Sequence, residues 1–408
     1  MYLPLPLITQ TLLGVLSLAV LVTGIYCLYR GYRPSKRRHY KPVEHHRSAA
    51  TREVLQKEPA TPPRKAVNRP VLLGLLLMLF SFTGRTSFQY VFPVGRDEPG
   101  PMRRGQVQTV NGWGGSKIRV ETYGPSTAPT LLFTHGWGMD STEWYYAKRH
   151  LAGKFQLIVW DLPGLGQSTQ PDDRDFGLER MARDLRAVLS TAPGKPVVLV
   201  GHSIGGMINL TFCRLFPELL GRDVAGIVQV DTSYTNPVKT TNHSQLSQAL
   251  QKPVAEPVLH AMIGLSPLVH FMNWLSYENG ISYLTNAKSS FAGAETRGQI
   301  DLVSRLQTEA SPAVIARGTL AMFHWDESAI LPRITVPVLL VVGKEDTTTL
   351  PSASEHMHAA IPHSTIALVS PAAHYSLLEQ NQAVDSAIGQ FAATHLGTME
   401  AFRGPPQQ

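Results

Sequence analysis

The chain has 408 residues, of which 43% are hydrophobic and 16% are charged. This balance excludes an intrinsically disordered protein, which would bury too little apolar surface to offset the entropy of its chain. Two cysteines exclude a disulfide scaffold and a cysteine-based zinc module. The net charge of +7 is local, because residues 30–70 hold 12 Lys and Arg against 3 Asp and Glu and the rest is slightly negative. Nucleic-acid binding is therefore not expected.

The first 29 residues contain no charged side chain, and Leu7 to Tyr29 form a run of 23 mostly apolar residues. A helix of this length measures about 34 Å, which is enough to cross a hydrocarbon core of about 30 Å. The positive charges begin after the run, at Arg30, whereas a cleaved signal peptide carries them before it. We therefore expect a transmembrane helix over residues 1–29.

The residues that follow predict which side of the membrane the rest of the chain occupies. Because Lys and Arg near a helix end stay in the cytoplasm, residues 30–70 are expected to be a basic, largely disordered cytoplasmic linker. A second apolar run, Val71–Gly84, is short for a span, and it reaches sufficient length over residues 71–94 if Arg85 snorkels or pairs. A second crossing would place residues 97–408 outside the cytoplasm. A helix lying in the membrane interface is the alternative.

From residue 106 onward, short β-rich runs alternate with amphipathic helical stretches. Several of the runs are continuously apolar, which is typical of parallel strands covered on both faces by helices. Strand–helix alternation predicts a doubly wound, mainly parallel α/β sheet, with an antiparallel hairpin formed by its first two strands. The expected strands are Gln106–Val110, Lys117–Thr122, Thr130–Thr134, Gln156–Trp160, Val197–Val200, Gly226–Val230, Val336–Val342 and Thr365–Val369. Helices are expected over Glu143–Leu151, Phe176–Ser190, Ile204–Leu219, Pro351–Ala360 and Tyr375–His395.

One stretch interrupts this alternation. Residues 233–331 contain no clear strand but include helical segments such as Val258–Leu275 and Val314–Trp325. They are expected to form a helical cap inserted between two strands of the sheet. Most of the large apolar side chains of the cap would form its own core, and the remainder would line an acyl or alcohol pocket. These side chains are Met262, Phe271, Met272, Trp274, Phe291, Met322, Phe323 and Trp325.

The most informative motif is GHSIG, residues 201–205, which lies between the apolar run VVLV and a helix. A serine on a sharp strand-to-helix turn needs small neighbours two residues away on either side. Gly201 and Gly205 meet this requirement, and the turn would present the hydroxyl of Ser203 over the positive end of the helix. A structural serine in a turn is the competing interpretation.

The chain at this point resembles an α/β-hydrolase-fold enzyme, over residues from about 106 to 395. The HGWG sequence at 135–138 is similar to the oxyanion loop of that family, and DLPGLGQS at 161–168 is similar to its D-x-x-G-x-G-x-S turn. Asp346 follows the apolar run VLLVV, and His374 follows the last strand. The order Ser, Asp, His agrees with the family.

The resemblance implies a role for each of these residues. Ser203 would be the nucleophile, His374 its general base and Asp346 the carboxylate that orients the imidazole. The backbone N–H groups of Trp137 and Ile204 would form the oxyanion hole. Asp231, at the end of another strand, remains the alternative for the acid. His135 and His202 are expected to shape their loops rather than transfer protons.

These residues predict a membrane-anchored serine hydrolase that cleaves an ester-type bond of a small, hydrophobic substrate through an acyl-serine intermediate. No metal or cofactor is required. Carbon–carbon bond hydrolysis, perhydrolysis and acyl transfer use the same serine chemistry and remain open. A ligand-binding protein on a hydrolase scaffold is the alternative of another class, because a fold does not determine an activity. The sequence leaves the substrate and the oligomeric state open.

Overall fold

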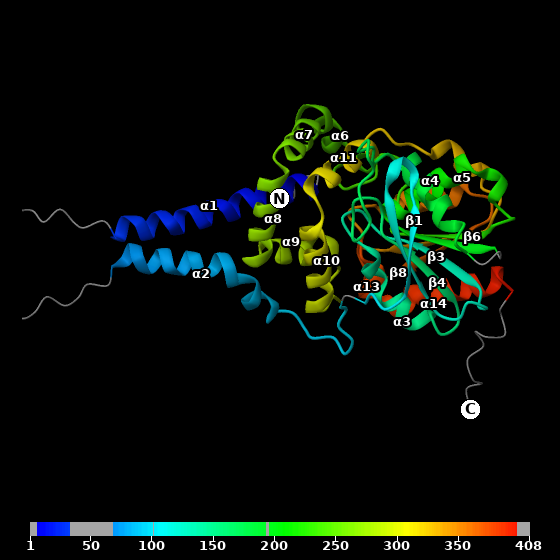
Figure 1. The fold of residues 1–408 in the computed structure, drawn as a ribbon, viewed down its shortest axis with the longest axis horizontal. Coiled ribbons are helices and arrows are strands. Elements are labelled where there is room, and N and C mark those ends of the chain that lie inside the picture. Colours follow the sequence, from blue (N-terminus) through cyan, green and yellow to red (C-terminus); the bar gives the residue numbers. More distant parts are fainter. Residues whose placement is uncertain (1–5, 33–67, 101, 193–195, 398–408) are drawn as a thin grey trace, which may run out of the picture.

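A computed structural model describes residues 6–32, 68–100, 102–192 and 196–397 of the chain (Figure 1). Its centre is an eight-stranded sheet with the strand order β1-β2-β4-β3-β5-β6-β7-β8. The strands are β1 (Gln106–Asn111), β2 (Lys117–Tyr123), β3 (Thr130–Thr134), β4 (Gln156–Trp160), β5 (Val197–His202), β6 (Val224–Val230), β7 (Val338–Gly343) and β8 (Ser364–Val369). β2 pairs antiparallel with β1 and β4, and the other pairs are parallel. Every predicted strand lies within two residues of its expected ends, so the predicted fold class is confirmed.

Helices cover both faces of the sheet. One face packs against α4 (Leu178–Leu189), α5 (Ile204–Leu215) and α12 (Pro351–Ala360). The opposite face packs against α3 (Tyr145–Leu151) and α14 (Asn381–His395), and the short α13 (Ser376–Glu379) precedes α14. The side chains of β3, β4, β5 and β7 are buried at every position, as the continuously apolar runs predict for parallel strands between two helical layers.

Six cap helices lie between β6 and β7. They are α6 (Ser244–Leu250), α7 (Glu256–Gly264), α8 (Ser266–Glu278), α9 (Ile281–Ser290), α10 (Arg297–Glu309) and α11 (Pro312–Met322). The helix expected over Val258–Leu275 is in fact two helices, because the chain bends by 100° between Gly264 and Ser266. Pro267 is favourable in the first turn of α8 but could not continue α7 without a break.

The eight large apolar side chains of the cap divide differently from the expectation. Six of them, Met262, Met272, Phe291, Met322, Phe323 and Trp325, are buried in core clusters. Of these six, Met322 and Phe323 also line a cavity that Ser203 and His374 line as well. Phe271 and Trp274 do neither, because they are exposed on the surface of α8.

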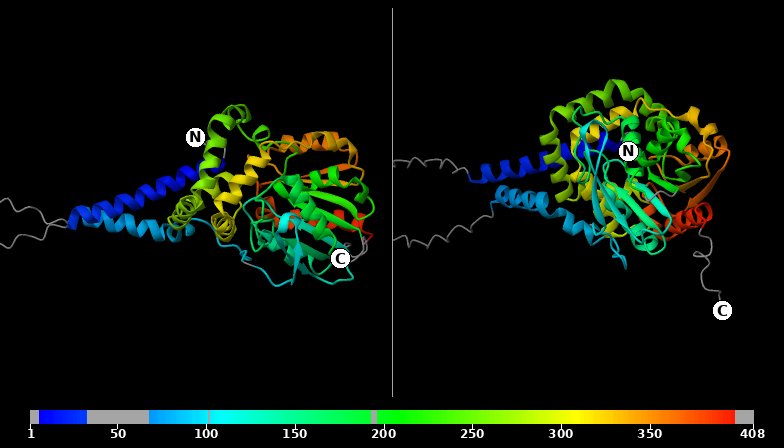
Figure 2. Two further views of the ribbon diagram at one scale, coloured as in Figure 1. Left: turned by 45° about the horizontal axis from the view of Figure 1, so that its top comes forward. Right: turned by 45° about the vertical axis from the view of Figure 1, so that its right-hand side comes forward.

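The two N-terminal helices form a hairpin that projects from the cap side of the molecule (Figures 1 and 2). They are α1 (Pro6–Tyr32) and α2 (Arg69–Gln89), and both are long and apolar enough to cross a membrane. They pack closely at Gly24 and Gly74, where a Cβ on Gly74 would lie 2.9 Å from the Gly24 carbonyl oxygen. Small residues of this kind are typical of interfaces between membrane helices. Most of the expected linker, residues 33–67, lies outside the described residues.

Several polar side chains of the hairpin bond to the hairpin itself or to the cap. Ser17, Thr23, Ser81 and Thr83 each donate a hydrogen bond of 2.8–2.9 Å to the carbonyl oxygen four residues earlier. Arg85 pairs with an aspartate of α10, Asp301, at 2.7 Å, and its guanidinium lies over the Tyr277 ring. This pairing is the condition under which the second apolar run can extend past Arg85, and α2 does continue to Gln89.

Candidate active site

Ser203 lies on a sharp turn between β5 and α5. Its backbone has φ 52° and ψ −118°, a conformation that is rare for a residue with a side chain. The neighbouring glycines are required by close packing, because a Cβ on Gly201 would lie 2.4 Å from the backbone of Gly205. A Cβ on Gly205 would in turn lie 2.4 Å from the Thr134 carbonyl oxygen. The two glycines therefore allow the turn that lifts the Ser203 hydroxyl above the sheet.

The structure brings Ser203, His374 and Asp346 together from three separate loops. His374 Nε2 lies 3.2 Å from Ser203 Oγ, and His374 Nδ1 lies 2.9 Å from Asp346 Oδ2. The carboxylate of Asp346 is buried and also accepts hydrogen bonds from Thr348 N–H and from both the N–H and the hydroxyl of Thr349. These bonds fix the carboxylate against the imidazole, so the three side chains form a continuous hydrogen-bonded chain.

Asp231, the alternative acid, occupies a different position. Its carboxylate accepts hydrogen bonds from Gly343 N–H at 2.7 Å and from the Ser376 hydroxyl at 2.5 Å. No hydrogen bond joins it to His374 among the described residues. Burial and then repulsion from Asp346 raise the pKa of Asp231 to about 6. Its contacts connect β7 to α13, so its geometry fits support of the loops better than orientation of the imidazole.

The two backbone N–H groups expected in the oxyanion hole come from two different loops, those that follow β5 and β3. Ile204 begins α5, and Trp137 lines the same cavity as Ser203. Within the described part of the chain, neither N–H donates to a protein acceptor, so both are available to a ligand. The Trp137 indole donates to the Ile315 carbonyl at 3.1 Å and lies against Gly318, where a Cβ would be 2.2 Å from the ring. Helix α11 of the cap thus positions the loop.

Two buried histidines hold the loops around the site. His135 accepts a hydrogen bond from Leu162 N–H through Nε2, at 2.9 Å, and so connects the loops that follow β3 and β4. His202 Nδ1 pairs with Glu143 at 2.7 Å, and its Nε2 donates to the His374 carbonyl at 2.8 Å. Sequence reasoning missed Glu143 because nothing in its local pattern distinguishes it from a solvated residue at the start of a helix.

A cavity of about 450 Å³ opens beside Ser203 and His374. Its lining is mainly apolar and also carries hydroxyl and amide groups, many of them from α9 and the loop after β7. The apolar lining includes Met207, Val238, Leu259, Ile315, Met322 and Phe323. Thr9 and Gln10 of α1 also line the cavity, which the sequence did not indicate because apolar length alone does not show where a membrane helix begins. Among the described residues, no cluster of three His, Cys, Asp or Glu side chains could hold a metal ion.

Comparisons with known proteins agree with this architecture. Residues 131–387 match the Alpha/beta hydrolase family. The uncharacterized protein Rv2715 of Mycobacterium tuberculosis is 27% identical over 66% of this chain and 75% of its own length. An esterase of Thermogutta terrifontis superimposes with a TM-score of 0.58 at 23% identity, covering 71% of this chain and 99% of its own. A bacterial membrane phospholipase A superimposes with a TM-score of 0.55 at 20% identity, covering 74% and 87% respectively.

The family match covers most of the sheet, the serine turn and the cap, and the solved structures share the same fold. The chain therefore belongs to the alpha/beta hydrolase family.

Proposed function

We propose that this protein is a membrane-anchored serine hydrolase that cleaves an ester-type bond in a small, hydrophobic substrate. The observation that carries the proposal is the chain of hydrogen bonds from Asp346 through His374 to Ser203 beside a mainly apolar cavity. An esterase and a membrane phospholipase A, which share the fold, are named for reactions of this class.

The proposed reaction follows from the roles that these groups can perform. Ser203 Oγ attacks the carbonyl carbon of the ester while His374 Nε2 takes its proton, and Asp346 stabilises the resulting imidazolium. The N–H groups of Trp137 and Ile204 bind the oxygen that becomes negative in the tetrahedral intermediate. His374 then protonates the departing alcohol. Water attacks the acyl-serine by the same steps in reverse and releases the acid.

The proposed anchor is the hairpin of α1 and α2. Both helices have membrane length, and the basic residues between them would remain in the cytoplasm. Residue 32 and residue 69 lie at the end of the hairpin that is remote from the cap, so the hydrolase domain would face away from the cytoplasm.

The test is to label the full-length protein in detergent with a fluorophosphonate and to measure its intact mass. We expect one adduct on the wild type and none on Ser203→Ala, together with hydrolysis of p-nitrophenyl esters by the wild type alone. Ser233→Ala, which alters a buried serine outside the cavity lining, is the matched control and should retain the adduct. A folded wild-type protein that neither forms an adduct nor hydrolyses esters would instead be a ligand-binding protein on this scaffold.

A further inference from the structure

The membrane hairpin is shorter outside the cap than a bilayer requires. Residues 10–18 of α1 lie against the cap: Gln10 donates to Gln307 at 2.8 Å, Gly14 contacts Met272, and Leu18 packs on the cap core. Only residues 19–32 of α1 extend beyond it, which is about 21 Å of helix. This length falls about 10 Å short of a hydrocarbon core of about 30 Å.

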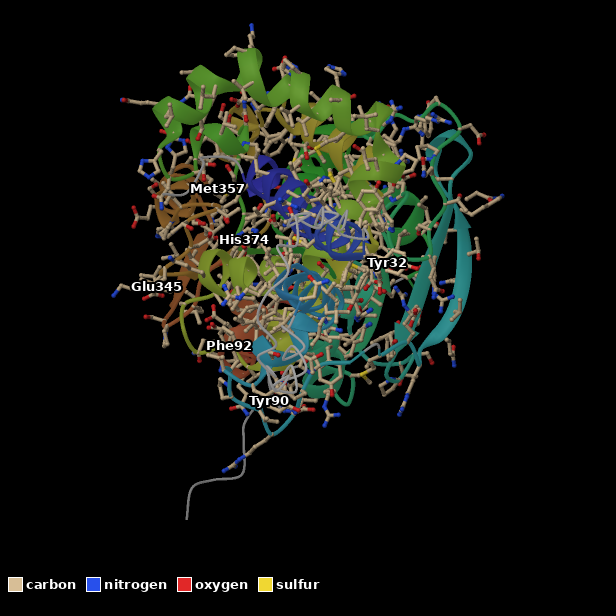
Figure 3. All side chains as sticks on the ribbon, turned by 90° about the vertical axis from the view of Figure 1, so that its left-hand side faces the viewer. Tyr32, Tyr90, Phe92, Glu345, Met357 and His374 are labelled. Carbon is tan, nitrogen blue, oxygen red and sulfur yellow. The ribbon has the colours of Figure 1, made fainter. Side chains whose placement is uncertain are left out.

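The part of α2 that extends beyond the cap is also shorter than the hydrocarbon core, although the whole helix is not. The whole of α2 has 21 residues and measures about 31 Å, which matches the thickness of the hydrocarbon core of the bilayer. Its last three turns lie against the cap, because Phe82 and Trp274 have ring centroids 6.0 Å apart and Gly84 closely approaches the Asn279 carbonyl. The exposed Tyr90, labelled in Figure 3, follows the end of α2 and is suited to a membrane–water interface. A full crossing by α2 therefore brings the adjoining part of the cap to membrane depth.

The cap surface at this depth is apolar and exposed. Helix α8 contains no Lys, Arg or Asp; its one histidine, His270, is exposed, and its single carboxylate is its last residue, Glu278. Four large apolar side chains, one from the residue that precedes α8 and three from α8 itself, are 37–54% exposed and are here called the α8 ridge. Trp274 joins the ridge to Phe82 of α2. The ridge consists of Leu265, Leu268, Phe271 and Trp274. Such a continuous apolar surface marks an interaction site.

We propose that the α8 ridge is immersed in the bilayer, so that the cap itself forms part of the membrane anchor. Lipid covers the ridge, because the ridge adjoins two helices of membrane length. It adds the apolar length that is missing from the parts of α1 and α2 beyond the cap. The pairing of Arg85 with Asp301 fits this depth, since an unpaired charge there would be costly.

The immersion identifies a class of substrate, and this step rests on the proposed hydrolase function. Thr9 and Gln10, at the start of α1, line the cavity that holds Ser203, so a membrane helix forms one wall of the site. The cavity lining is mainly apolar and also includes hydroxyl groups and Lys288 of α9. These properties fit an ester that resides in the membrane and has both an acyl chain and a polar head.

The position of the ridge is tested with the full chain in phosphatidylcholine vesicles. A nitroxide is attached to Leu268→Cys in a Cys27→Ser background, since Cys213 is fully buried and would not react. Collisions with O2, which concentrates in hydrocarbon, are compared with collisions with a water-soluble nickel chelate. Leu75→Cys on α2 is the membrane control, and Leu368→Cys on β8 is the aqueous control.

We expect the Leu268 label to give an O2-to-nickel ratio close to that of Leu75 and at least 5-fold above that of Leu368. A ratio like that of Leu368 would overturn the proposal. Low collision with both reagents, together with spin–spin broadening, would also overturn it, because a second copy of the chain would then cover the ridge. An aqueous ratio at Leu75 itself would instead refute the anchoring by the hairpin.

The functional consequence is tested with a double substitution, Leu268→Ser with Phe271→Ser. We expect at least a 10-fold lower rate on a long-chain lipid ester in vesicles and less than a 2-fold change on p-nitrophenyl acetate. Leu368→Ser is the control and should change neither rate. Equal rates of wild type and double variant on the vesicle substrate would contradict the claim that the immersed ridge lets the enzyme take its ester from the bilayer. A wild type that hydrolyses neither ester would refute the proposed function rather than the position of the ridge.

Discussion

His202 and Glu143 form a buried pair directly behind Ser203, with Nδ1 and Oε1 2.7 Å apart. The second nitrogen of His202 bonds the carbonyl oxygen of His374, and the second oxygen of Glu143 accepts from Gly136 N–H at 2.8 Å. The His374 carbonyl can only accept, so His202 Nε2 carries a hydrogen, and a second donation from Nδ1 to the carboxylate makes the ring an imidazolium. The pair connects the oxyanion loop to the loop that carries His374.

The first prediction concerns the pH dependence that this pair confers. Burial lowers the pKa of His202, but the charge and hydrogen bond of Glu143 outweigh it and raise the pKa to about 9. A histidine whose pKa is raised contributes its full stabilisation below its ordinary value of about 6.5 and loses it as the pH rises through about 9. We therefore expect kcat/KM for a neutral ester to fall above about pH 9.

Glu143→Gln removes the charge that holds this proton. The loss of kcat/KM should then begin at least 1 pH unit lower, and kcat at pH 8 should fall about 10-fold with little change in KM. The measurement is a pH–rate profile of both proteins. Glu218→Gln, at an exposed glutamate in the short helical turn after α5, should leave the profile unchanged. An unaltered profile in Glu143→Gln would show that the pair does not position the site.

The second prediction distinguishes the two candidate acids. Asp346→Asn leaves the size of the side chain unchanged but removes the charge that orients His374, so we expect kcat to fall about 10³- to 10⁴-fold. Asp231→Asn should lower kcat less than 10-fold, because Asp231 bonds Gly343 and Ser376 rather than the imidazole. Steady-state kinetics with p-nitrophenyl butyrate decides between them. The opposite ranking would assign the acid to Asp231.

The third prediction tests whether the cap positions the oxyanion loop. Glycine-to-alanine changes inside helices are usually stabilising, but a Cβ on Gly318 would lie 2.2 Å from the Trp137 ring. Gly318→Ala should therefore displace the loop and reduce kcat about 10- to 100-fold, since one lost oxyanion donor costs about 10²- to 10³-fold. Gly264→Ala, where a Cβ meets no atom within 4 Å, is the control. Equal kcat values in the two variants would show that the cap does not position the oxyanion loop.

The sequence was sufficient for the sheet because its strands are local and strongly patterned. Runs such as VVLV before Ser203 are buried between two helical layers, and the glycines around the serine are required by contacts within a few residues. The pairing of Asp346 with His374 was accessible only through the resemblance to a known family. The carboxylate and the imidazole come from loops after different strands, and no local pattern shows that they meet.

Contacts between distant segments account for what the sequence did not predict. Phe271 and Trp274 were expected in the core or the pocket, yet both are exposed, because helical spacing cannot show which face of α8 meets the cap. The part of the active site formed by Thr9 and Gln10 also depends on a tertiary contact, the insertion of α1 into the cap. The apolar run of α1 predicts that it crosses a membrane, but it carries no signal for where the helix begins.

The last prediction concerns this wall of the cavity. Gln10 donates to Gln307, and Gln307 donates to the Tyr375 hydroxyl at 3.1 Å, so the start of α1 is bonded to the residue that follows His374. Thr9→Trp would place a large ring in the cavity and leave the side chains of Gln10, Gln307 and Tyr375 unchanged. We expect the KM for esters with long acyl chains to rise at least 10-fold, while the KM for acetate esters changes less than 3-fold.

The matched control is Val15→Trp, at a position of α1 that is exposed outside the cavity. Its kinetics should equal those of the wild type, because a tryptophan there adds volume to the outer surface of the helix and not to the site. A uniform loss of activity on short and long esters in Thr9→Trp would indicate a disturbed Ser203 rather than a narrowed cavity. Unchanged selectivity in Thr9→Trp would mean that long acyl chains bind away from α1, along the side formed by Leu259 and Met322.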